Sequence, residues 1–546
     1  MFATSPSPTL LTDPFLLFPT ANSIQVVWFT EFPGSSHHVR YGQNLTDSVE
    51  ATTTLLSRTR EDKDSQVMGK TFDELQRREI WRHEAVVTGL TPGNRIPYQV
   101  TSVREDGQRI SSREFTLSAT PQRESSLKIL LTSDHQLKPM TSANLQKVSE
   151  TIDKLDAIFF AGDLVNIPDR ASEWFDDSEG NAFFPTLQGH GHYSLTKNGI
   201  TTVYKGGEFI QNTPLFITIG NHEVMGRHSN KKSLNEQFDD SIPRQIAQEL
   251  SVTPLEKTEL KNASFNTDTV QEIFSLPEKN YYAVTFGDIR LVVLYATNMW
   301  RSPSLADNAK GKYRERKRDL DIPKNWGYGQ HIFEPIAKGS EQYSWLEKEL
   351  NSAEFQSAKY KIVMLHHPPH SLGENSVPAY TNPQQVLELD EEGKIKAVRY
   401  EYPQDADYLV RDIVPLLEEK GVQLVFYGHS HLWNRFKSPR GMHFLETSNV
   451  GNSYGAYLGE NKRKVPENYQ ESYAAVGNPN GLDPIVPAIA PLRDENGNPQ
   501  PYIASNDITA FSIFDTETGM ISSYYFDTRS PNSPVIKFDE FSIIQS

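Results

Sequence analysis

The sequence predicts an α/β fold of two packed mixed sheets flanked by helices, preceded by a small all-β unit. Residues 1 to about 120 contain short β-like segments and little helical periodicity. After residue 127, apolar strand-like runs alternate with amphipathic helix-like segments, as in sheets whose strands are joined by crossover helices. The chain has 546 residues, more than one hydrophobic core normally spans, which favours at least two domains.

The first unit is expected to be an antiparallel sandwich, because its strand-like segments are short and turn signals separate them. Thr91-Pro92-Gly93-Asn94 is one such turn. The polar stretch 47–75 is expected to form a long loop. The predicted domains are 1–120 and 127–546, joined by a linker at 121–126. The strand-like segments include 23–30, 38–42 and 98–103.

In the second unit, residues 144–155 place Leu145, Val148, Ile152 and Leu155 on one helical face, as a crossover helix requires. The other expected elements are helices at 342–350 and 409–420, and a hairpin at 281–286 and 290–295. Long polar insertions interrupt this pattern, and loops of such length in a compact domain are usually functional or mobile. They are expected to hold most of the substrate specificity, and they lie near 167–212, 225–278, 300–340, 370–405 and 451–505.

Five apolar runs share one feature: each is followed at its carboxyl end by side chains with oxygen or nitrogen donors. Open α/β sheets place their ligand sites at this end of the strands. A single His-x-His pair on a loop is more often solvated than metal-bound, so the inference depends on the recurrence of the pattern. In chain order the blocks are Ser133-Asp134-His135-Gln136, Gly162-Asp163-Leu164-Val165-Asn166, Gly220-Asn221-His222-Glu223, His366-His367-Pro368-Pro369-His370 and Gly428-His429-Ser430-His431.

These blocks, in this order, resemble the calcineurin-like metallophosphoesterase superfamily. Its pattern is Asp-x-His, Gly-Asp-x-x, Gly-Asn-His-Glu/Asp, a His that closes a strand, and Gly-His-x-His. The resemblance implies an αββα metallophosphoesterase sandwich and an enzyme that hydrolyses phosphate esters, as a phosphatase or a phosphodiesterase. The Trp28 strand and the turn Gly89-Leu90-Thr91-Pro92-Gly93 also resemble the fibronectin-III-like N-terminal domain of purple acid phosphatases.

Carried over position by position, the family pattern implies a binuclear centre of two divalent metal ions, with Mn, Fe and Zn all compatible. Two such ions clamp the oxygens of an in-line displacement, and a hydroxide held between them is the natural nucleophile. His366 is preferred to His367 because it directly closes its strand. The implied ligands are Asp134 and His431 for the first site, Asn221, His366 and His429 for the second, and Asp163 as the bridge.

The third block also implies the catalytic groups. His222 is expected to stand beside the metals without ligating them, and to stabilise the transition state or protonate the leaving oxygen. Glu223 is expected to orient the His222 ring. The alternative for His222 is a core histidine bonded to backbone. His370 and Arg435 are candidates to contact phosphate or line the pocket, and a purely structural role is an equal alternative for both.

The chain departs from the family pattern at two positions. Gln136 stands where the family usually has His; its amide oxygen can still coordinate the first metal, but more weakly than imidazole. His135 is one residue out of register and is expected to point away. Asn166 stands where purple acid phosphatases carry the Tyr that colours them. We therefore expect a colourless enzyme that does not require ferric iron.

Composition restricts the partners and the compartment. The net charge is 54 − 70 = −16 and no long basic face is visible, so a small phosphate ester is favoured over a nucleic acid polymer. There are no cysteines, so metal ligands must be oxygen or nitrogen donors. No apolar run approaches the roughly 20 residues of a membrane span. No signal peptide is visible, so a cytoplasmic location is the default, with secretion possible if a leader was removed.

Two other functions compete with phosphoesterase activity. A binding or scaffold protein could keep the metallophosphoesterase fold and lose turnover, and Gln136 is the one residue that favours this. Retention of His222 beside the expected ligands counts against it, because a scaffold has no use for a proton-transfer group there. An adhesion module led by residues 1–120 is the third hypothesis, and nothing in the sequence marks a binding surface for it.

Overall fold

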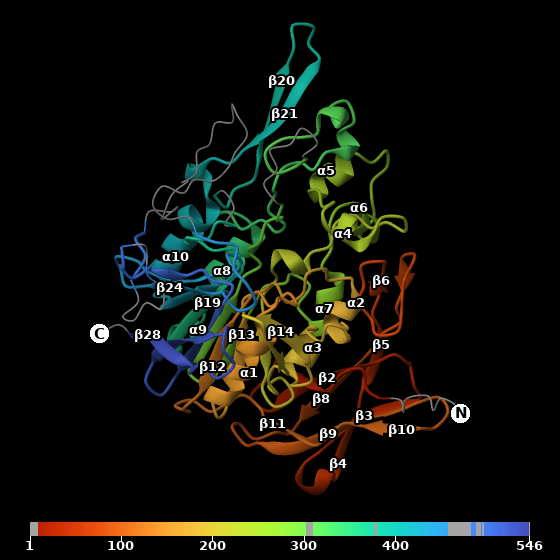
Figure 1. Ribbon diagram of the computed structural model, residues 1–546, viewed down its shortest axis with the longest axis vertical. Coiled ribbons are helices and arrows are strands. Elements are labelled where there is room, and N and C mark those ends of the chain that lie inside the picture. Colours follow the sequence, from red (N-terminus) through yellow and green to blue (C-terminus); the bar gives the residue numbers. More distant parts are fainter. Residues whose placement is uncertain are drawn as a thin grey trace.

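The computed structural model describes residues 9–301, 310–375, 379–456, 482–486, 493 and 496–544. An all-β unit, red and orange at the bottom of Figure 1, packs under a larger α/β unit. A hairpin of β20 (Gln384–Leu389) and β21 (Ile395–Glu401) projects at the opposite end of the molecule. The predicted fold class is confirmed, while the limits 1–120, 121–126 and 127–546 stay a prediction.

The all-β unit consists of two antiparallel sheets, with strand orders β1-β2-β8-β5 and β10-β9-β3-β4, where β11 also pairs with β9. Trp28, Tyr98 and Val100 are fully buried between the sheets. The strands are β1 (Phe15–Leu17), β2 (Ser23–Thr30), β3 (Ser36–Tyr41), β4 (Asp47–Glu50), β5 (Thr52–Leu55), β8 (Trp81–Thr88), β9 (Ile96–Val103), β10 (Arg109–Ser111) and β11 (Phe115–Leu117).

The prediction of one long loop over 47–75 is wrong. This stretch supplies β4 and β5 to the two sheets, and β6 (Arg60–Glu61) pairs with β7 (Gln76–Arg77) in a small hairpin. These strands are not recognisable in the sequence because they are polar and each is only two to four residues long, too short to show a clear alternation. β6 lies beside α2 (Ala171–Phe175) of the α/β unit (Figure 1), where the Arg60 N–H donates to the Asp169 carbonyl oxygen over 2.9 Å.

The α/β unit contains two mixed sheets, of order β16-β13-β12-β26-β27-β28 and β17-β18-β19-β22-β24-β23-β25. Parallel strands occupy one end of the first sheet and the middle of the second. The strands are β12 (Lys128–Thr132), β13 (Ala157–Phe160), β16 (Leu215–Ile217), β17 (Tyr282–Phe286), β18 (Ile289–Val293), β19 (Tyr360–Met364), β22 (Leu424–Tyr427), β23 (Trp433–Lys437), β24 (His443–Thr447), β25 (Tyr502–Ile503), β26 (Ile508–Asp515), β27 (Met520–Asp527) and β28 (Ile536–Ser542).

Alternation along the strands explains how both faces of the second sheet are buried. Ile362 and Met364 of β19 point into the core shared with the first sheet, whereas Val363 between them belongs to a separate apolar cluster. Leu346 and Leu417 lie in this second cluster, so helices cover the outer face of the sheet. Leu145 and Val148 from another helix join the shared core. The order of layers is therefore helix, sheet, sheet, helix, as predicted.

The predicted helices are present with shifted ends. α1 is Thr141–Thr151, and α8 is Glu341–Leu350 with the Ser340 hydroxyl capping its first turn. The helix expected over 409–420 begins as a π-helical turn, Leu409–Ile413, and continues as α10, Val414–Glu419. The expected hairpin over 281–295 is β17 and β18.

The long insertions contain short elements of their own. Those described include α3 (Phe183–Leu187), α4 (Leu234–Phe238), α5 (Arg244–Glu249), α6 (Lys257–Ala263), α7 (Asp268–Phe274), and the hairpin of β14 (Tyr193–Lys197) and β15 (Ile200–Tyr204). Parts of the insertions predicted at 300–340, 370–405 and 451–505 lie outside the described residues. Among the helices within the described ranges, none combines the length and hydrophobicity needed to cross a bilayer.

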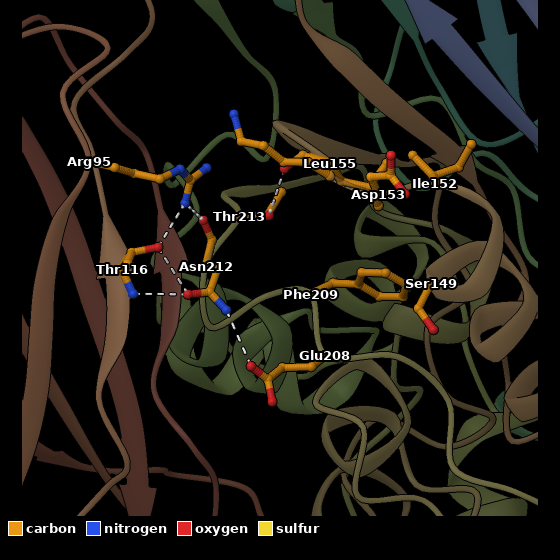
Figure 2. Close-up of a pocket in the computed structure, with 11 residues that line it drawn as sticks. Arg95, Thr116, Ser149, Ile152, Asp153, Leu155, Glu208, Phe209, Asn212 and Thr213 are labelled. Atoms are coloured by element: carbon orange, nitrogen blue, oxygen red, sulfur yellow. Dashed lines mark hydrogen bonds between the residues drawn. The ribbon is translucent and has the colours of Figure 1, made fainter.

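An aromatic cluster joins the two units. The ring of Phe29 from β2 lies 5.0 Å from that of Phe175 and 5.5 Å from that of Phe184 in the α/β unit. Polar contacts border a second part of the boundary (Figure 2), where Arg95 Nη1 donates to the Asn212 carbonyl oxygen and the Thr116 N–H donates to Asn212 Oδ1 over 2.9 Å. A pocket of about 310 Å³ opens beside these contacts.

Replacing Phe29 with Ala should therefore lower the free energy of unfolding by about 3–5 kcal/mol, because Phe29 is fully buried and the cavity would lie between the units. The measurement is the midpoint of urea-induced unfolding. Val86→Ala is the matched control: Val86 lies on the neighbouring strand β8 but is 46% exposed, so its loss should cost within about 0.5 kcal/mol. Equal shifts for the two variants would contradict this account of the boundary.

Candidate metal centre

The five sequence blocks meet where the two sheets present the carboxyl ends of their parallel strands. β12, β13 and β16 of the first sheet and β19 and β22 of the second end directly before them. Two groups of buried side chains there have donor atoms within 4.8 Å of one another: Asp134, Asp163 and His431 in one, and His366, His367 and His429 in the other.

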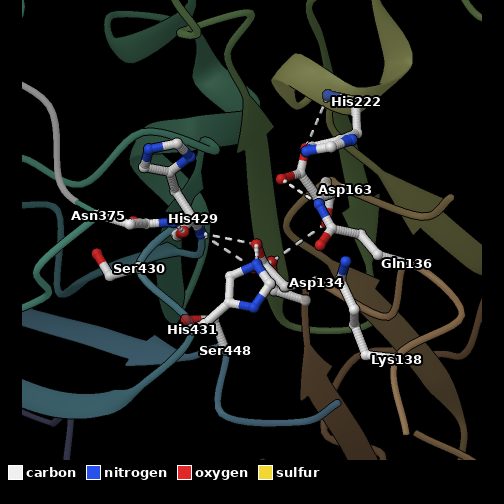
Figure 3. A network of polar contacts seen from close by, with 12 residues as sticks. Asp134, Gln136, Lys138, Asp163, His222, Asn375, His429, Ser430, His431 and Ser448 are labelled. Carbon is white, nitrogen blue, oxygen red and sulfur yellow. Dashed lines mark hydrogen bonds and ion pairs between the residues drawn. The ribbon is translucent and has the colours of Figure 1, made fainter. Parts of the chain in front are cut away.

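The first group is centred on two carboxylates (Figure 3). His431 Nε2 lies 3.2 Å from Asp134 Oδ1, and the other His431 ring nitrogen, Nδ1, is 2.6 Å from Asn452 Oδ1. Gln136 Nε2 donates to Asp163 Oδ2 over 2.9 Å. Gln136 therefore reaches the centre through its amide, and its Oε1 is buried without a partner among the described residues.

Two members of the second group, His366 and His429, converge on the amide oxygen of Asn221. His366 Nε2 lies 3.1 Å and His429 Nδ1 lies 3.0 Å from Asn221 Oδ1. His366 Nε2 is also 3.3 Å from Asp163 Oδ2, so Asp163 touches both groups. The other His366 nitrogen, Nδ1, is 2.7 Å from the Ala161 carbonyl oxygen, which fixes the orientation of the ring.

His367 is the alternative to His366 as a ligand, but its ring is in hydrogen-bond contact with Thr297 and not with Asn221. Its Nδ1 is 3.0 Å from Thr297 Oγ1, its ring stacks on that of His429 with centroids 4.0 Å apart, and its Nε2 is buried without a partner among the described residues. Neither of its nitrogens has a contact with Asn221 or Asp163 that matches those of His366. The contacts favour His366 as the ligand.

Several residues of the site have a backbone conformation that residues other than glycine rarely adopt. Left-handed φ values of 43° to 82° are found at Asp134, Gln136, Asp163, His429 and His431. Each such residue costs of order 1–3 kcal/mol and persists only where its surroundings determine it, as they commonly do at functional sites. Close packing adds a further restriction, since a Cβ on Gly428 would collide with Ser133 and with Asp134 Oδ2.

Electrostatics makes this a place for cations. Burial disfavours the charged form of Asp163, but His366 and His222 hold its pKa well below the ordinary value. Burial lowers the pKa of His366, but the Asp163 carboxylate outweighs it and raises this pKa to about 9. The buried anionic charge therefore calls for a positive partner. Burial lowers the pKa of His429 well below its ordinary value, so this imidazole is neutral, the state that binds metals.

His222 lies beside the centre, where its backbone N–H donates to Asp163 Oδ1 over 2.9 Å, and its ring is held by a backbone group rather than by Glu223. The His222 ring donates through Nδ1 to the Asn166 carbonyl oxygen over 2.7 Å. The Glu223 carboxylate instead accepts the backbone N–H groups of Gly220, Asp163 and Leu164 over 2.7–2.8 Å. Its acceptors are thus used in joining two of the ligand loops, and the prediction that it orients His222 is corrected.

The two candidate substrate contacts have structural surroundings. Arg435 is buried, its guanidinium forms two hydrogen bonds of 2.8 and 3.0 Å with Asp539, and it lies over the Phe541 ring. His370 packs against Phe444, and burial lowers its pKa to about 3, so it carries no charge for a phosphate. The contacts of Arg435 match the structural alternative, whereas both ring nitrogens of His370 are buried without a partner among the described residues, so a substrate contact for His370 stays a prediction.

His135 points away from the site, as expected. Its Nε2 lies 2.9 Å from Thr132 Oγ1, and its ring packs against Phe160. Three further residues that the sequence interpretation did not single out lie at the centre. Lys138 Nζ donates to Asn166 Oδ1 over 2.9 Å, and the Tyr454 ring lies 4.5 Å from that of His431, whose partner Asn452 is the third. A signal existed for Asn452, because it follows β24, the parallel neighbour of β22.

The donor set fits divalent metal ions. Every candidate ligand supplies a carboxylate, amide or imidazole donor, the types that Mn²⁺, Fe²⁺ and Zn²⁺ accept. Several donors near the centre are buried without a partner among the described residues, including Gln136 Oε1 and His367 Nε2. Buried polar atoms are normally paired, so these atoms indicate that the centre is built for a ligand.

Comparison with known proteins agrees with this geometry. A family model described as calcineurin-like phosphoesterase matches residues 127–432. The chain belongs to this family. The matched range begins at the strand before Asp134 and ends just after His431, so it contains every candidate ligand. No curated protein matches the chain in sequence.

Solved structures resemble this calcineurin-like phosphoesterase in fold. The purple acid phosphatase PPD1 from yellow lupin (Lupinus luteus) seeds superposes with a TM-score of 0.53 at 15% identity, over 97% of this chain and 74% of that one. A structure of PhoD gives a TM-score of 0.48 at 12% identity, over 98% of this chain and 90% of that one. The first likeness extends over the all-β unit as well as the α/β unit.

His366→Ala should reduce the divalent metal bound per chain, because His366 Nε2 is one of the two imidazole nitrogens that meet Asn221 Oδ1. His367→Ala is the matched control: it is adjacent in sequence and equally buried, but is held by Thr297. Metal content after dialysis against Mn²⁺, measured by plasma mass spectrometry, distinguishes the two. A larger loss in His367→Ala would exchange their roles.

Proposed function

We propose that this calcineurin-like phosphoesterase hydrolyses small phosphate esters with a pair of divalent metal ions. The observation that carries the proposal is the position of Asp163, which lies in the first donor group and within 3.3 Å of His366 Nε2 in the second. A bridging carboxylate between two sets of terminal ligands is what a two-metal centre needs. Asp134, Gln136 and His431 are the proposed ligands on one side, and Asn221, His366 and His429 those on the other.

Divalent ions at such a centre supply Lewis acidity to the phosphoryl oxygens and activate water at neutral pH. The protein's own contribution is positioning and proton transfer. His222 is bound through Nδ1 to the Asn166 carbonyl oxygen, which fixes its tautomer and leaves Nε2 as the nitrogen that exchanges a proton. We assign His222 the proton transfer to the leaving oxygen, or stabilisation of the charge that develops there.

Lys138 gives the centre a positive side chain beside the carboxylates. Its Nζ donates a hydrogen bond to Asn166 Oδ1. Burial lowers the pKa of Lys138, while the charges of Glu173, Asp163 and Asp134 favour its ammonium form. An ammonium group at this place attracts an anionic ester. The acidic overall charge of −16 disfavours a long polyanion, so the proposed substrate is a small ester.

Asn166 supports the inference that the enzyme is colourless and does not need ferric iron. The position holds no phenol, and its amide is already engaged: Nδ2 donates to the Gln136 carbonyl oxygen over 2.8 Å, and Oδ1 accepts from Lys138. The side chain therefore serves the loops around the metal ligands.

The direct test is hydrolysis of p-nitrophenyl phosphate and bis-p-nitrophenyl phosphate by the full chain. We expect turnover in the presence of Mn²⁺, loss of turnover after chelation, and recovery when Mn²⁺, Fe²⁺ or Zn²⁺ is restored. The ratio of the two rates reports whether monoesters or diesters are preferred. Absence of turnover with every metal and both esters would favour the scaffold hypothesis, under which the fold is kept and catalysis is lost.

His222→Ala should lower kcat by about 10²–10⁴-fold, the usual contribution of a positioned acid–base group, with bound metal unchanged because His222 is not a proposed ligand. His190→Ala is the control: its side chain is half exposed and pairs with Asp13. Steady-state kinetics with p-nitrophenyl phosphate and metal analysis of both variants are the measurements. A His222→Ala enzyme as active as wild type would support the alternative of a core histidine.

A further inference from the structure

The His222 ring is held by a hydrogen bond on one side and by a stacked aromatic ring on the other. On one side, the Asn166 carbonyl oxygen accepts the ring's Nδ1 hydrogen bond, and it is the one polar partner of the ring among the described residues. On the other side, the Phe238 ring stacks on His222 with centroids 5.1 Å apart and an interplanar angle of 27°. Glu223 is engaged elsewhere and the Trp300 ring is a more distant neighbour, with centroids 6.4 Å apart, so the position of His222 depends mainly on what holds Asn166 and Phe238.

The backbone at Asn166 is held by the buried carboxylate of Glu173. Glu173 Oε2 accepts the backbone N–H of Asn166 over 2.6 Å and that of Ile167 over 2.9 Å. Glu173 Oε1 in turn accepts from Arg170 Nη1 over 2.9 Å. Both charged side chains are less than a tenth exposed, so neither can exchange its partner for bulk water.

Phe238 is the last residue of α4, and hydrogen bonds hold the first two residues of this helix. The Leu234 N–H donates to Asp62 Oδ2 over 2.7 Å, and Asn235 Oδ1 accepts from Arg170 Nη2 over 2.9 Å. A helix this short moves as one piece, so a shift at Leu234 displaces Phe238.

The contacts that hold Asn166 and those that hold α4 both lead to one carboxylate, that of Asp62 in the all-β unit. Asp62 Oδ1 lies 3.0 Å from Arg170 Nη2, while its Oδ2 holds α4. Asp62 directly follows β6 and is 2% exposed. We propose that Asp62 is a positioning residue for His222: it holds Arg170, Glu173 and Asn166 on one side of the ring and α4 with Phe238 on the other. The all-β unit thereby contributes to catalysis without touching the substrate.

The charges explain why the connection is stiff. Asp62, Arg170 and Glu173 alternate in sign and are all buried, so displacing one leaves its neighbour with an uncompensated charge in a poorly solvating interior. Arg170 is suited to the central place because its planar fork reaches Glu173 with one nitrogen and Asp62 with another. This inference rests on the proposed function, because it assigns Asp62 a role in the use of His222.

Asp62→Asn tests the proposal. An amide has one acceptor oxygen pointing in one direction, so the substituted side chain can keep Arg170 or the Leu234 N–H, but not both. We expect kcat for p-nitrophenyl phosphate with Mn²⁺ to fall by about tenfold or more, since small displacements of catalytic groups cost this much. KM should change less than kcat, since Asp62 itself makes no contact with Lys138 or with the proposed metal ligands.

Asp268→Asn is the matched control. Asp268 pairs with Arg58 across the same boundary at 2.8 Å, with its side chain 13% exposed against 3% for Asp62, and none of its contacts leads to Asn166 or Phe238. It should leave kcat within about twofold of wild type. Arg170→Lys is a second test variant, because an ammonium group cannot reach both carboxylates as the fork does. It is used if Asp62→Asn fails to fold.

The second readout does not need turnover. In metal-free protein labelled with ¹⁵N-histidine, the His222 signals, assigned by their loss in His222→Gln, should report the Nδ1-protonated tautomer in wild type and Asp268→Asn. In Asp62→Asn this tautomer should be less populated. If Asp62→Asn and Asp268→Asn agree in kcat and in these signals, the proposal is overturned. If wild type hydrolyses neither ester, the proposed function fails, and the His222 signals alone decide the role of Asp62.

Discussion

The buried carboxylate of Asp163 is the constraint on which the rest of the site depends. It accepts from Gln136 Nε2 and from the backbone N–H of His222, and it lies 3.3 Å from His366 Nε2. A carboxylate only 2% exposed is tolerated when such partners replace water, because desolvation penalises the charged form. The partners follow different strands, so satisfying this one charge draws the ends of β12, β16 and β19 together around β13.

This gathering could be predicted from sequence because it follows from strand direction. Parallel strands bring their carboxyl ends to one edge, so polar blocks at the ends of apolar runs converge whatever lies between them. Asp134 and Asp163 meet in this way although their strands are joined by a helix and loops, and His366 and His429 meet likewise. The same reasoning extends to Asn452 beyond β24, whose distance from its strand concealed it.

Partner choice could not be predicted in the same way. Adjacency in sequence suggested that Glu223 serves His222, yet its oxygens bond backbone groups some 60 positions earlier in the chain. Arg435 follows the last block and has the charge a phosphate needs, but Asp539, 104 residues further on, neutralises it. Which donor meets which acceptor depends on the packing of β23 against β28 and of neighbouring loops, and no local pattern encodes that packing.

The boundary between the units bears on the hypothesis of an independent adhesion module. Arg60 pairs with Asp169 at 2.7 Å and Arg78 with Asp176 at 2.7 Å, while Ser172 donates to the fully buried Glu61. Both arginine side chains are less than a tenth exposed. Separating the units would break these ion pairs and expose side chains that are now buried against the α/β unit. A module built to bind outside partners gains nothing from such a surface. The all-β unit is therefore an integral part of this calcineurin-like phosphoesterase, and these buried side chains face the segment that follows β13.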